Sequence, residues 1–398
     1  MNYNKNILII TPRTYSGGAE RVAARLSNHF DALSKTFVVS FDSKKIDYEY
    51  SGSLNEIKTR TNGGIIRRIL SIAIGVVKLR RFKNIHNIDV SISMIGTPNI
   101  VNLLSKRKSE KCIVSIRTYI RKPKCIIKRI LHKKLIKKLY RKSDQIVAVS
   151  EGVRRDVMEY YDINGDKVKV IYPYCQISKM KQLSEEPIEE ENLHIFTHPV
   201  IINVARLTYD KGQWQLIRAF DQIKQKVKTA RLVFIGRGDM EETLRELALK
   251  SEYSDDIHFL GYQKNSFKYL KASSVLAFPS IIEGFGNAIC ESMACGTVVV
   301  SSDCKFGPRE IIAPDSDLKA SAVDVEIHDA GILIPVGDGK VLLNGEELQK
   351  EERMLSDALC QVLTNKNLKA RIEKGALERV KYFDQHNIVK QWDHIVYK

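Results

Sequence analysis

Short apolar runs alternate with longer amphipathic stretches along almost the whole chain, and this alternation restricts the fold more than any other feature of the sequence. In the first half the apolar runs lie at Ile7–Thr11, Thr36–Phe41, Asp89–Met94, Lys111–Arg117 and Asp144–Ser150. In the second half they lie at Val200–Arg206, Arg231–Gly236, Asp256–Gly261, Val275–Phe278 and Thr297–Ser301. Buried strands that are separated by helices are typical of parallel sheets. Because the pattern occurs twice, we predict an α/β protein with two parallel-sheet domains.

The length and one break in composition suggest where these domains meet. The chain has 398 residues, which is enough for two domains with separate cores. The acidic stretch Glu185-Glu186-Pro187-Ile188-Glu189-Glu190-Glu191 interrupts the alternating pattern, and we interpret it as an interdomain linker. We therefore predict an N-terminal domain over residues 1–185 and a C-terminal domain over residues 195–380.

Two glutamates stand eight residues apart in Glu283-Gly-Phe-Gly-Asn-Ala-Ile-Cys-Glu291, between two apolar runs. We expect a strand, a glycine-containing loop and a short helix, with Glu283 just before the helix and Glu291 about one turn inside it. The N-terminus of a helix attracts anions. A nucleotide-sugar would suit this site, because its pyrophosphate could meet the helix and its hydroxyls could meet the carboxylates. A capping acid followed by a solvated helix glutamate explains the spacing equally well.

Two cations follow the first apolar run of the second half. Arg206 and Lys211 stand in Arg206-Leu-Thr-Tyr-Asp-Lys211-Gly212, between a predicted strand and a helix that starts at Gln213. Open α/β sheets bind ligands at such strand-to-helix junctions. One of these cations could be an ordinary surface charge, but two around a glycine turn favour a bound diphosphate.

A glycine pair follows the first strand of the chain. In Ser16-Gly17-Gly18-Ala19-Glu20-Arg21 the two glycines stand just before an amphipathic helix that runs to about Phe30. Because glycine has no side chain, such a pair lets the backbone approach a ligand closely. Most glycine pairs are simply turns, so this pair alone indicates little.

Together these segments resemble the retaining glycosyltransferases of family 4, which have the GT-B fold. Seven matching segments follow the family order over nearly the whole chain: Ser16–Arg21, Ser143–Arg154, Asn203–Gly212, Phe234–Gly238, Phe259–Tyr262, Phe278–Gly296 and Ser302–Ile311. The resemblance implies two Rossmann-like, doubly wound domains that face a central cleft. It also implies that the last residues, 381–398, form a helix that crosses back to the N-terminal domain.

The resemblance also implies roles for particular residues. Arg206 and Lys211 would bind the donor pyrophosphate, Glu283 would face the donor sugar, and Glu291 would hold the ribose hydroxyls. The catalytic residues would thus be Glu283, Arg206 and Lys211. The resemblance implies no metal or other cofactor, because cationic side chains and helix termini take the place of a metal ion. The implied donor-binding residues are Gly17, Gly18, Arg117, Gly236, Tyr262, Gly286, Asn287, Ala288 and Glu291.

The chain departs from the family at one donor contact. Many relatives carry a histidine in the loop after the strand predicted at Lys111–Arg117, where it touches the donor sugar. This chain has Arg117-Thr118 there. The contact is therefore either absent or made by Arg117.

Charge is divided unevenly along the chain. Residues 1–190 contain 37 Lys and Arg against 18 Asp and Glu, and the segment Arg121–Lys142 contains eleven basic residues and no acid. We expect a helix here that buries Ile127, Ile130, Leu131, Leu135 and Leu139 and exposes a cationic face. The cationic face comprises Lys128, Arg129, Lys133, Lys134, Lys137 and Lys138.

Such a face suits an anionic membrane surface or the pyrophosphate of a polyprenyl-linked acceptor. Nucleic acid fits less well, because no recognition module is visible and the face lacks interleaved aromatic residues. Alternatively, the cations only keep the protein soluble.

The remaining features concern location. The apolar helix expected at Ile65–Leu79 contains three cations and is too short for a membrane span. Its apolar run Ile69–Val77 either enters the core, which we favour, or presses into a lipid interface. The seven cysteines are scattered without a Cys-x-x-Cys pair, which favours a reducing compartment. With no visible export signal, we expect a cytoplasmic protein that is peripheral on the inner face of the membrane.

We therefore predict a hexosyltransferase that retains anomeric configuration. The donor would be a nucleotide-sugar, most simply UDP-linked, and the acceptor a growing cell-surface glycan or a polyprenyl-linked oligosaccharide. A nucleotide-sugar epimerase of the same fold is the alternative, and a basic nucleic-acid-binding protein is a second one. Free epimerised sugar would indicate the epimerase, and tight RNA binding without turnover would indicate the nucleic-acid-binding protein.

Overall fold

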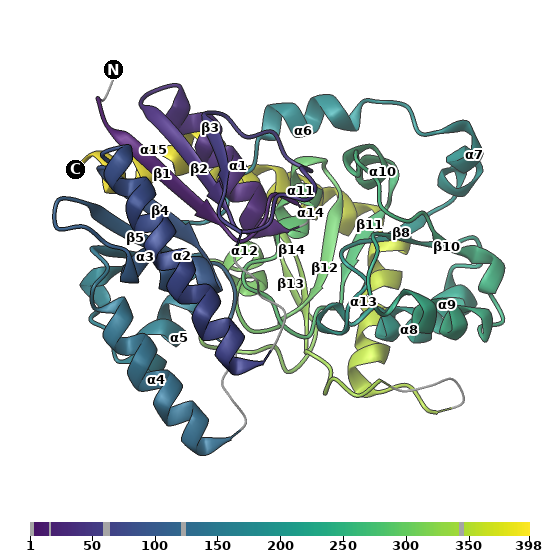
Figure 1. Ribbon diagram of the computed structural model, residues 1–398. Helices are drawn as coiled ribbons and strands as arrows, with labels where there is room; N and C mark the ends of the chain where they lie inside the picture. Colours follow the sequence, from purple (N-terminus) through teal and green to yellow (C-terminus); the bar gives the residue numbers. More distant parts are fainter. Residues whose placement is uncertain (1–3, 16, 59–63, 121–124, 342–345) are drawn as a thin grey trace. The chain divides into compact units, whose positions relative to one another are not determined.

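The computed structural model describes residues 4–15, 17–58, 64–120, 125–341 and 346–398. The chain forms two compact units, residues 1–173 with 388–398 and residues 174–387. Each unit is built around one seven-stranded sheet (Figure 1). The predicted α/β class with two mainly parallel sheets is confirmed.

The sheet of the first unit is entirely parallel, in the order β3-β2-β1-β4-β5-β6-β7. Its central strands are buried on both faces, which is why they read as unbroken apolar runs in the sequence. The strands are β1 (Asn6–Thr11), β2 (Lys35–Ser40), β3 (Ser53–Glu56), β4 (Val90–Met94), β5 (Lys111–Ile116), β6 (Gln145–Ala148) and β7 (Val168–Val170).

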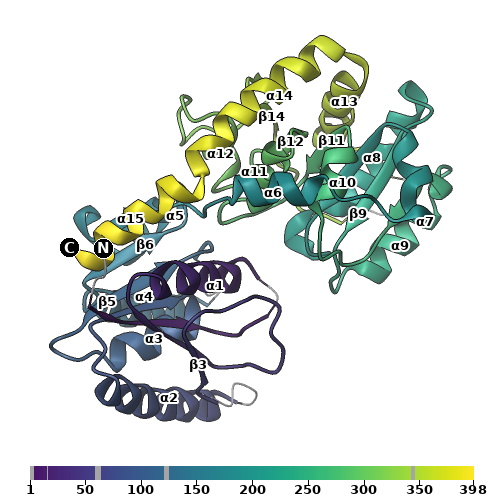
Figure 2. The ribbon, with the colours of Figure 1, turned by 90° about the horizontal axis from the view of Figure 1, so that it is seen from above.

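Helices cover both faces of this sheet. The connections β1→β2 and β3→β4 run in opposite directions along the sheet, so their helices α1 and α2 lie on opposite faces (Figure 2). The helix α3 packs between α2 and α4. The helices are α1 (Gly18–Asp31), α2 (Ile65–Ile85), α3 (Gly96–Leu104), α4 (Ile126–Tyr140) and α5 (Glu151–Tyr161).

The end of the chain belongs to the first unit. Most of α15 (Gln385–Tyr397) packs there, with Trp392 buried. The His29 ring is 2.7 Å from Asp393, and the Tyr397 and Ser34 hydroxyls are 2.8 Å apart. These contacts join the two ends of the chain across more than 360 residues of sequence.

The second unit has the sheet order β10-β9-β8-β11-β12-β14-β13, in which only β13 is antiparallel to its neighbour. Its strands are β8 (Val200–Val204), β9 (Arg231–Ile235), β10 (Ile257–Phe259), β11 (Val275–Phe278), β12 (Val298–Ser302), β13 (Glu326–His328) and β14 (Gly331–Ile334). Its helices are α6 (Ile177–Ser184), α7 (Glu190–Leu193), α8 (Gln213–Lys226), α9 (Glu241–Leu249), α10 (Phe267–Ala272), α11 (Asn287–Ala294), α12 (Pro308–Ile312), α13 (Lys350–Thr364) and α14 (Lys366–Val380).

The acidic stretch is part of the second unit, which differs from the linker that we predicted. The chain passes from the first unit to the second between Pro173 and Tyr174, and α6 packs on α10 and α11. The Lys268 ammonium lies 2.6 Å from the Glu189 carboxylate, and Lys271 pairs with Glu185. Two of the exposed acids therefore pair with lysines of α10, so that the stretch lies on the surface of the second unit.

Two predictions about apolar faces are wrong. In α2, Ile69, Leu70, Ile74 and Val77 are exposed, although the run Ile69–Val77 was expected in the core. In α4, Leu139 is buried as expected, but the apolar side chains at positions 130, 131 and 135 are exposed. The side chain of residue 127 lies outside the described part. The helix α3 contacts both α2 and α4, and the outward sides of the two helices stay exposed.

Candidate active site

The order of strands in the second sheet identifies where a ligand would bind. From β8 the chain continues through α8 to β9 on one side, and from β11 it continues through α11 to β12 on the other. The loops that follow β8 and β11 therefore diverge from neighbouring strands. In open α/β sheets such a switch point is where ligands bind.

The loop after β8 carries two of the predicted catalytic residues. The Arg206 side chain is exposed, and its carbonyl accepts a 2.9 Å hydrogen bond from Gln213 Nε2. Lys211 ends a short 3-10 turn and is followed by Gly212, whose φ is +63°. A Cβ on Gly212 would lie 2.2 Å from the Pro279 carbonyl oxygen. The glycine therefore lets this loop lie directly against the end of β11.

The loop after β11 brings Glu283 to Lys211. The Lys211 ammonium donates to Glu283 Oε1, and the Ser280 hydroxyl donates to the same oxygen at 2.9 Å. The two charged side chains are only 15% and 10% exposed. Two predicted residues that are 72 positions apart thus form a largely buried ion pair at the switch point. Ser280 was not predicted, although its place directly after Pro279 is the signal that could have identified it.

The short helix α11 begins beside this pair. Gly286 is its N-cap residue, and Asn287 and Ala288 stand half-buried in its first turn. Glu291 lies one turn further along and is buried. The N–H groups and the dipole at the start of a helix favour an anion at this end of α11.

The neighbouring loop of β9 meets the loop of β8 through a second glycine. Gly236 has a φ of +144°, and a Cβ there would lie 1.8 Å from the Ala205 carbonyl oxygen. Its N–H donates to the Gly261 carbonyl at 2.8 Å. Tyr262, which follows Gly261, is exposed. The predicted residues Gly236 and Tyr262 are thus carried on adjoining loops.

Thiol chemistry and metal ligands were considered at the same edge. Burial raises the pKa of the Cys304 thiol well above its usual range, and the nearby Glu283 carboxylate adds to this shift. The thiol is therefore protonated at neutral pH and unsuited to act as a nucleophile. No group of three His, Cys, Asp or Glu side chains that could hold a metal ion is found in the described ranges.

In the first unit, the glycine pair is supported by residues that we did not predict. Gly17 precedes α1, and its N–H and carbonyl each lie 3.3 Å from the Tyr48 hydroxyl. The Glu20 carboxylate is buried, and Arg13 Nε donates to it at 3.1 Å. Only the spacing of Glu20 from the glycines could have pointed to it. Gly18 is exposed, and the matching segment's first residue, 16, lies outside the described residues.

Arg117 follows β5 at the carboxyl edge of the first sheet. Burial, and secondly the positive charge of Arg25, lower the pKa of its guanidinium to about 10.

The cations predicted for α4 do not share one face. Lys134, Lys138 and Arg129 are exposed. Lys137 pairs with Asp162, and the Lys133 ammonium lies 5.7 Å from the centre of the Tyr160 ring. The side chain of residue 128 lies outside the described part.

Comparisons with known proteins agree with this geometry. Residues 16–176 match the family model described as Glycosyltransferase Family 4, and residues 184–332 match the one described as Glycosyl transferases group 1. An uncharacterized glycosyltransferase of Methanocaldococcus jannaschii is 32% identical over 78% of each chain. The chain belongs to glycosyltransferase family 4. The predicted class of enzyme, a hexosyltransferase, is confirmed.

Two further proteins are similar to this family 4 glycosyltransferase over nearly their whole length. The N-acetylgalactosamine-N,N'-diacetylbacillosaminyl-diphospho-undecaprenol 4-alpha-N-acetylgalactosaminyltransferase of Campylobacter jejuni is 27% identical, over 92% of this chain and 94% of its own. Anabaena HepE, in a crystal structure with UDP, superimposes with a TM-score of 0.74 at 17% identity, over 98% and 99% of the two chains. The structural likeness confirms the GT-B fold. Within the described part of this glycosyltransferase, no helix is long and apolar enough to span a membrane.

Proposed function

We propose that this glycosyltransferase moves a hexose from a UDP-sugar, with retention of anomeric configuration, to a growing cell-surface glycan or polyprenyl-linked oligosaccharide. The observation that carries the proposal is the meeting of Lys211 and Glu283 at the switch point, beside the N-terminus of α11. A cation, a carboxylate and free helix N–H groups at one point match the diphosphate and hydroxyl groups of such a donor.

The difficult step is the separation of the sugar from its diphosphate. The bond between the anomeric carbon and the phosphate oxygen breaks, and a bond to the acceptor oxygen forms on the same face of the sugar. Lys211 and Arg206 would stabilise the negative charge that develops on the leaving group. The leaving phosphate oxygen would take the proton of the acceptor hydroxyl, which balances the reaction without a metal or another cofactor.

Glu283 would orient the donor sugar. Its carboxylate is held from two sides, by Lys211 and by the Ser280 hydroxyl. We infer that the donor diphosphate draws Lys211 toward itself and that Glu283 then accepts a hydrogen bond from a sugar hydroxyl. Glu291 and the first turn of α11, with Asn287 and Ala288, would hold the ribose and the phosphates. Gly17, Gly18, Arg117, Gly236, Gly286 and Tyr262 remain predicted donor contacts.

The acceptor side of the proposal rests on charge and on one relative. The name of the Campylobacter relative includes a diphospho-undecaprenol acceptor. In this chain, Arg129, Lys134 and Lys138 of α4 are exposed and α4 contains no acid. Each cation near an anionic lipid surface contributes about 1 kcal/mol of attraction. This supports a location at the inner face of the cytoplasmic membrane, where α4 would meet anionic lipid or the acceptor pyrophosphate.

The test is a transfer assay with isotope-labelled UDP-hexoses and a membrane extract as the source of acceptor. We expect label in the lipid or glycan fraction, release of UDP, and an unchanged rate after a chelator is added. Chromatography of the sugar products separates the alternatives. Free epimerised hexose would indicate an epimerase, and no turnover together with tight RNA binding would indicate a nucleic-acid-binding protein.

A further inference from the structure

The helix α2 has apolar side chains on two opposite sides. Its packed side repeats every four residues and consists of Ser71, Gly75, Leu79 and Lys83, all of which are buried. The opposite side carries Ile66, Ile69, Leu70, Ile74 and Val77, which are between 42% and 83% exposed. Exposed apolar side chains on the outer side of a helix that already packs with its inner side indicate a second apolar binding partner.

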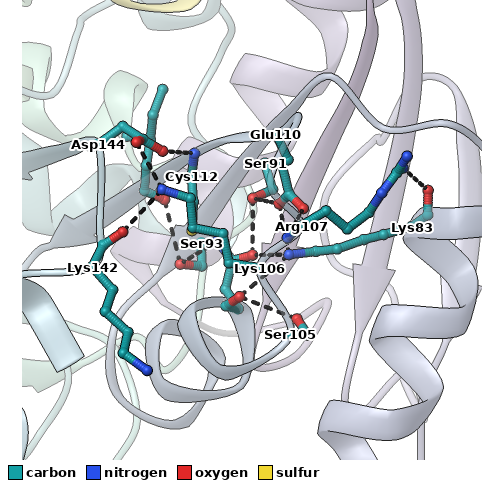
Figure 3. Close-up of polar contacts among 12 residues, drawn as sticks. Lys83, Ser91, Ser93, Ser105, Lys106, Arg107, Glu110, Cys112, Lys142 and Asp144 are labelled. Carbon is teal, nitrogen blue, oxygen red and sulfur yellow. Dashed lines mark hydrogen bonds and ion pairs between the residues drawn. The ribbon is translucent and has the colours of Figure 1, made fainter.

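The rotation of α2 is set by a buried ion pair. The Lys83 ammonium lies 2.6 Å from the Glu110 carboxylate, with both side chains fully buried (Figure 3). It also donates to Asn102 Oδ1 at 2.7 Å. The Ser91 hydroxyl lies within hydrogen-bond distance of both acceptors and can donate its one proton to either. Turning α2 to hide its outer side would carry Lys83 out of the core and leave the Glu110 carboxylate buried without its partner, at a large energetic cost. The outer apolar side therefore stays outward.

The outer side of α4 repeats the pattern. Ile126, Ile130, Leu131 and Leu135 are between 48% and 63% exposed, and they alternate with the exposed Lys134. Ten of the 21 exposed large apolar side chains among the described residues lie on α2 and α4. Because α2 follows β3 and α4 follows β5, both helices begin at the carboxyl edge of the parallel sheet. This edge also carries the loops of Gly17 and Arg117.

The two helices that carry these apolar side chains are also positively charged. The 21 residues of α2 include six Lys and Arg and no acid, and the 15 residues of α4 also include no acid. Aliphatic side chains on helices whose only charged residues are cations complement the acyl boundary and the anionic headgroups of a lipid bilayer. We propose that the outward sides of α2 and α4 form one docking surface that inserts its aliphatic side chains into an anionic phospholipid bilayer.

Other occupants fit this surface less well. A second copy of the chain would bring two helix pairs with cations and no acids of their own together, and their like charges repel. A nucleic acid would use the cations but would leave the aliphatic side chains in water. The inference extends the membrane location in the proposed function. The assay below contains neither donor nor acceptor, so a failure of docking is distinguishable from a failure of transfer.

The experiment separates insertion from charge attraction by salt. Sedimentation of the full chain with vesicles of phosphatidylglycerol and phosphatidylcholine is compared at about 0.1 M and about 1 M salt, where the screening length falls from about 10 Å to about 3 Å. We expect part of the binding to survive at high salt. Leu70→Ser with Val77→Ser should lower that surviving partition at least roughly tenfold, since two aliphatic side chains lose their burial in lipid.

A matched control is available in the second unit. Leu249 and Val323 are 76% and 79% exposed, so Leu249→Ser with Val323→Ser removes as much exposed apolar surface away from α2 and α4. This variant should bind vesicles like the parent protein. Lys134→Gln with Lys138→Gln should weaken binding only at low salt.

A fluorescent variant tests insertion directly. The two native tryptophans, Trp214 and Trp392, are buried, so Leu70→Trp should report its own surroundings. Its emission should move to shorter wavelength on vesicles and be quenched by brominated lipid, whereas that of Leu249→Trp should not change. Equal loss of binding in the α2 and control variants, or no high-salt binding in the parent, would overturn the proposal. So would a change of oligomeric mass in the Leu70→Ser, Val77→Ser variant without loss of vesicle binding.

Discussion

At the scale of single residues, the candidate site depends on side chains that the fold brings together from distant loops. Lys211 and Glu283 are 72 positions apart, and their pairing requires Gly212 to let the loop after β8 lie against Pro279. Ser280 supports the same carboxylate. The motifs in the sequence identified the two charged residues, but only the packing of the two loops shows that Lys211 and Ser280 both donate to one oxygen of Glu283.

Loss of either cation should slow the chemical step. We expect Lys211→Gln and Arg206→Gln each to lower kcat roughly 10²–10³-fold, as is found when one preorganised contact to a developing charge is removed. Lys250→Gln removes one exposed cation from the same unit and is the control, which should keep full activity. Steady-state kinetics with a labelled donor measures this. An unchanged kcat in Lys211→Gln would refute its assigned role.

Glu291 should act mainly on binding of the donor. We expect Glu291→Ala to raise the donor KM while kcat changes little, because ribose hydroxyls are held before and during the reaction alike. Since Glu291 is buried, the melting temperature must be measured beside the kinetics. A well-folded variant with unchanged donor affinity would contradict the assignment.

At the scale of helices and strands, buried polar contacts decide how α2 packs. Lys83 is one of the largest fully buried side chains among the described residues, and it is held by Glu110 and Asn102. Burial lowers the pKa of Lys83, while the Glu110 carboxylate opposes this shift. The hydrophobic pattern of α2 suggested core burial of Ile69–Val77, but the ion pair turns that run outward.

Breaking this ion pair from one side should be severe. We expect Lys83→Met to lower the free energy of unfolding by about 3–5 kcal/mol, because Glu110 would remain buried without its partner. The double variant Lys83→Met, Glu110→Gln should recover part of this loss, since no uncompensated charge remains. Urea unfolding measures both. Equal stability of the parent and Lys83→Met would show that the pair does not hold α2.

At the scale of the whole molecule, the two units differ in charge. The first unit carries 37 Lys and Arg against 15 Asp and Glu, whereas the second carries 27 against 32. The basic excess is thus confined to the unit with α2 and α4.

The seven cysteines are all free, and five are buried. Burial raises the pKa of the Cys112 thiol to about 11 and that of Cys295 to about 12.

Reaction with a thiol reagent should therefore report the fold. At pH 8 we expect one cysteine, the exposed Cys125, to react rapidly, because a thiol reagent reaches only an accessible side chain without opening of the fold. The others should react slowly, and all seven should react after unfolding in guanidinium. Cys125→Ser should remove the rapid phase. More than one rapid thiol in the parent would mean that the core opens more readily than the structure indicates.

The sequence by itself determined the class of the fold, the positions of most strands along the chain and the family. A strand that is buried on both faces is a continuous apolar run, which can be recognised from the sequence alone. The glycine and charge motifs at strand ends can also be recognised without knowing which residues they contact in the fold. It did not reveal β14, a strand of four residues in a long irregular stretch, because so short a run has no distinctive period. Only the tertiary structure decided that the acidic stretch binds α10, that Lys211 meets Glu283, and that α2 turns an apolar side outward. All three features depend on which residues a charged segment, or a helix with two apolar sides, contacts in the fold. Those contacts are made between segments that are far apart in the chain.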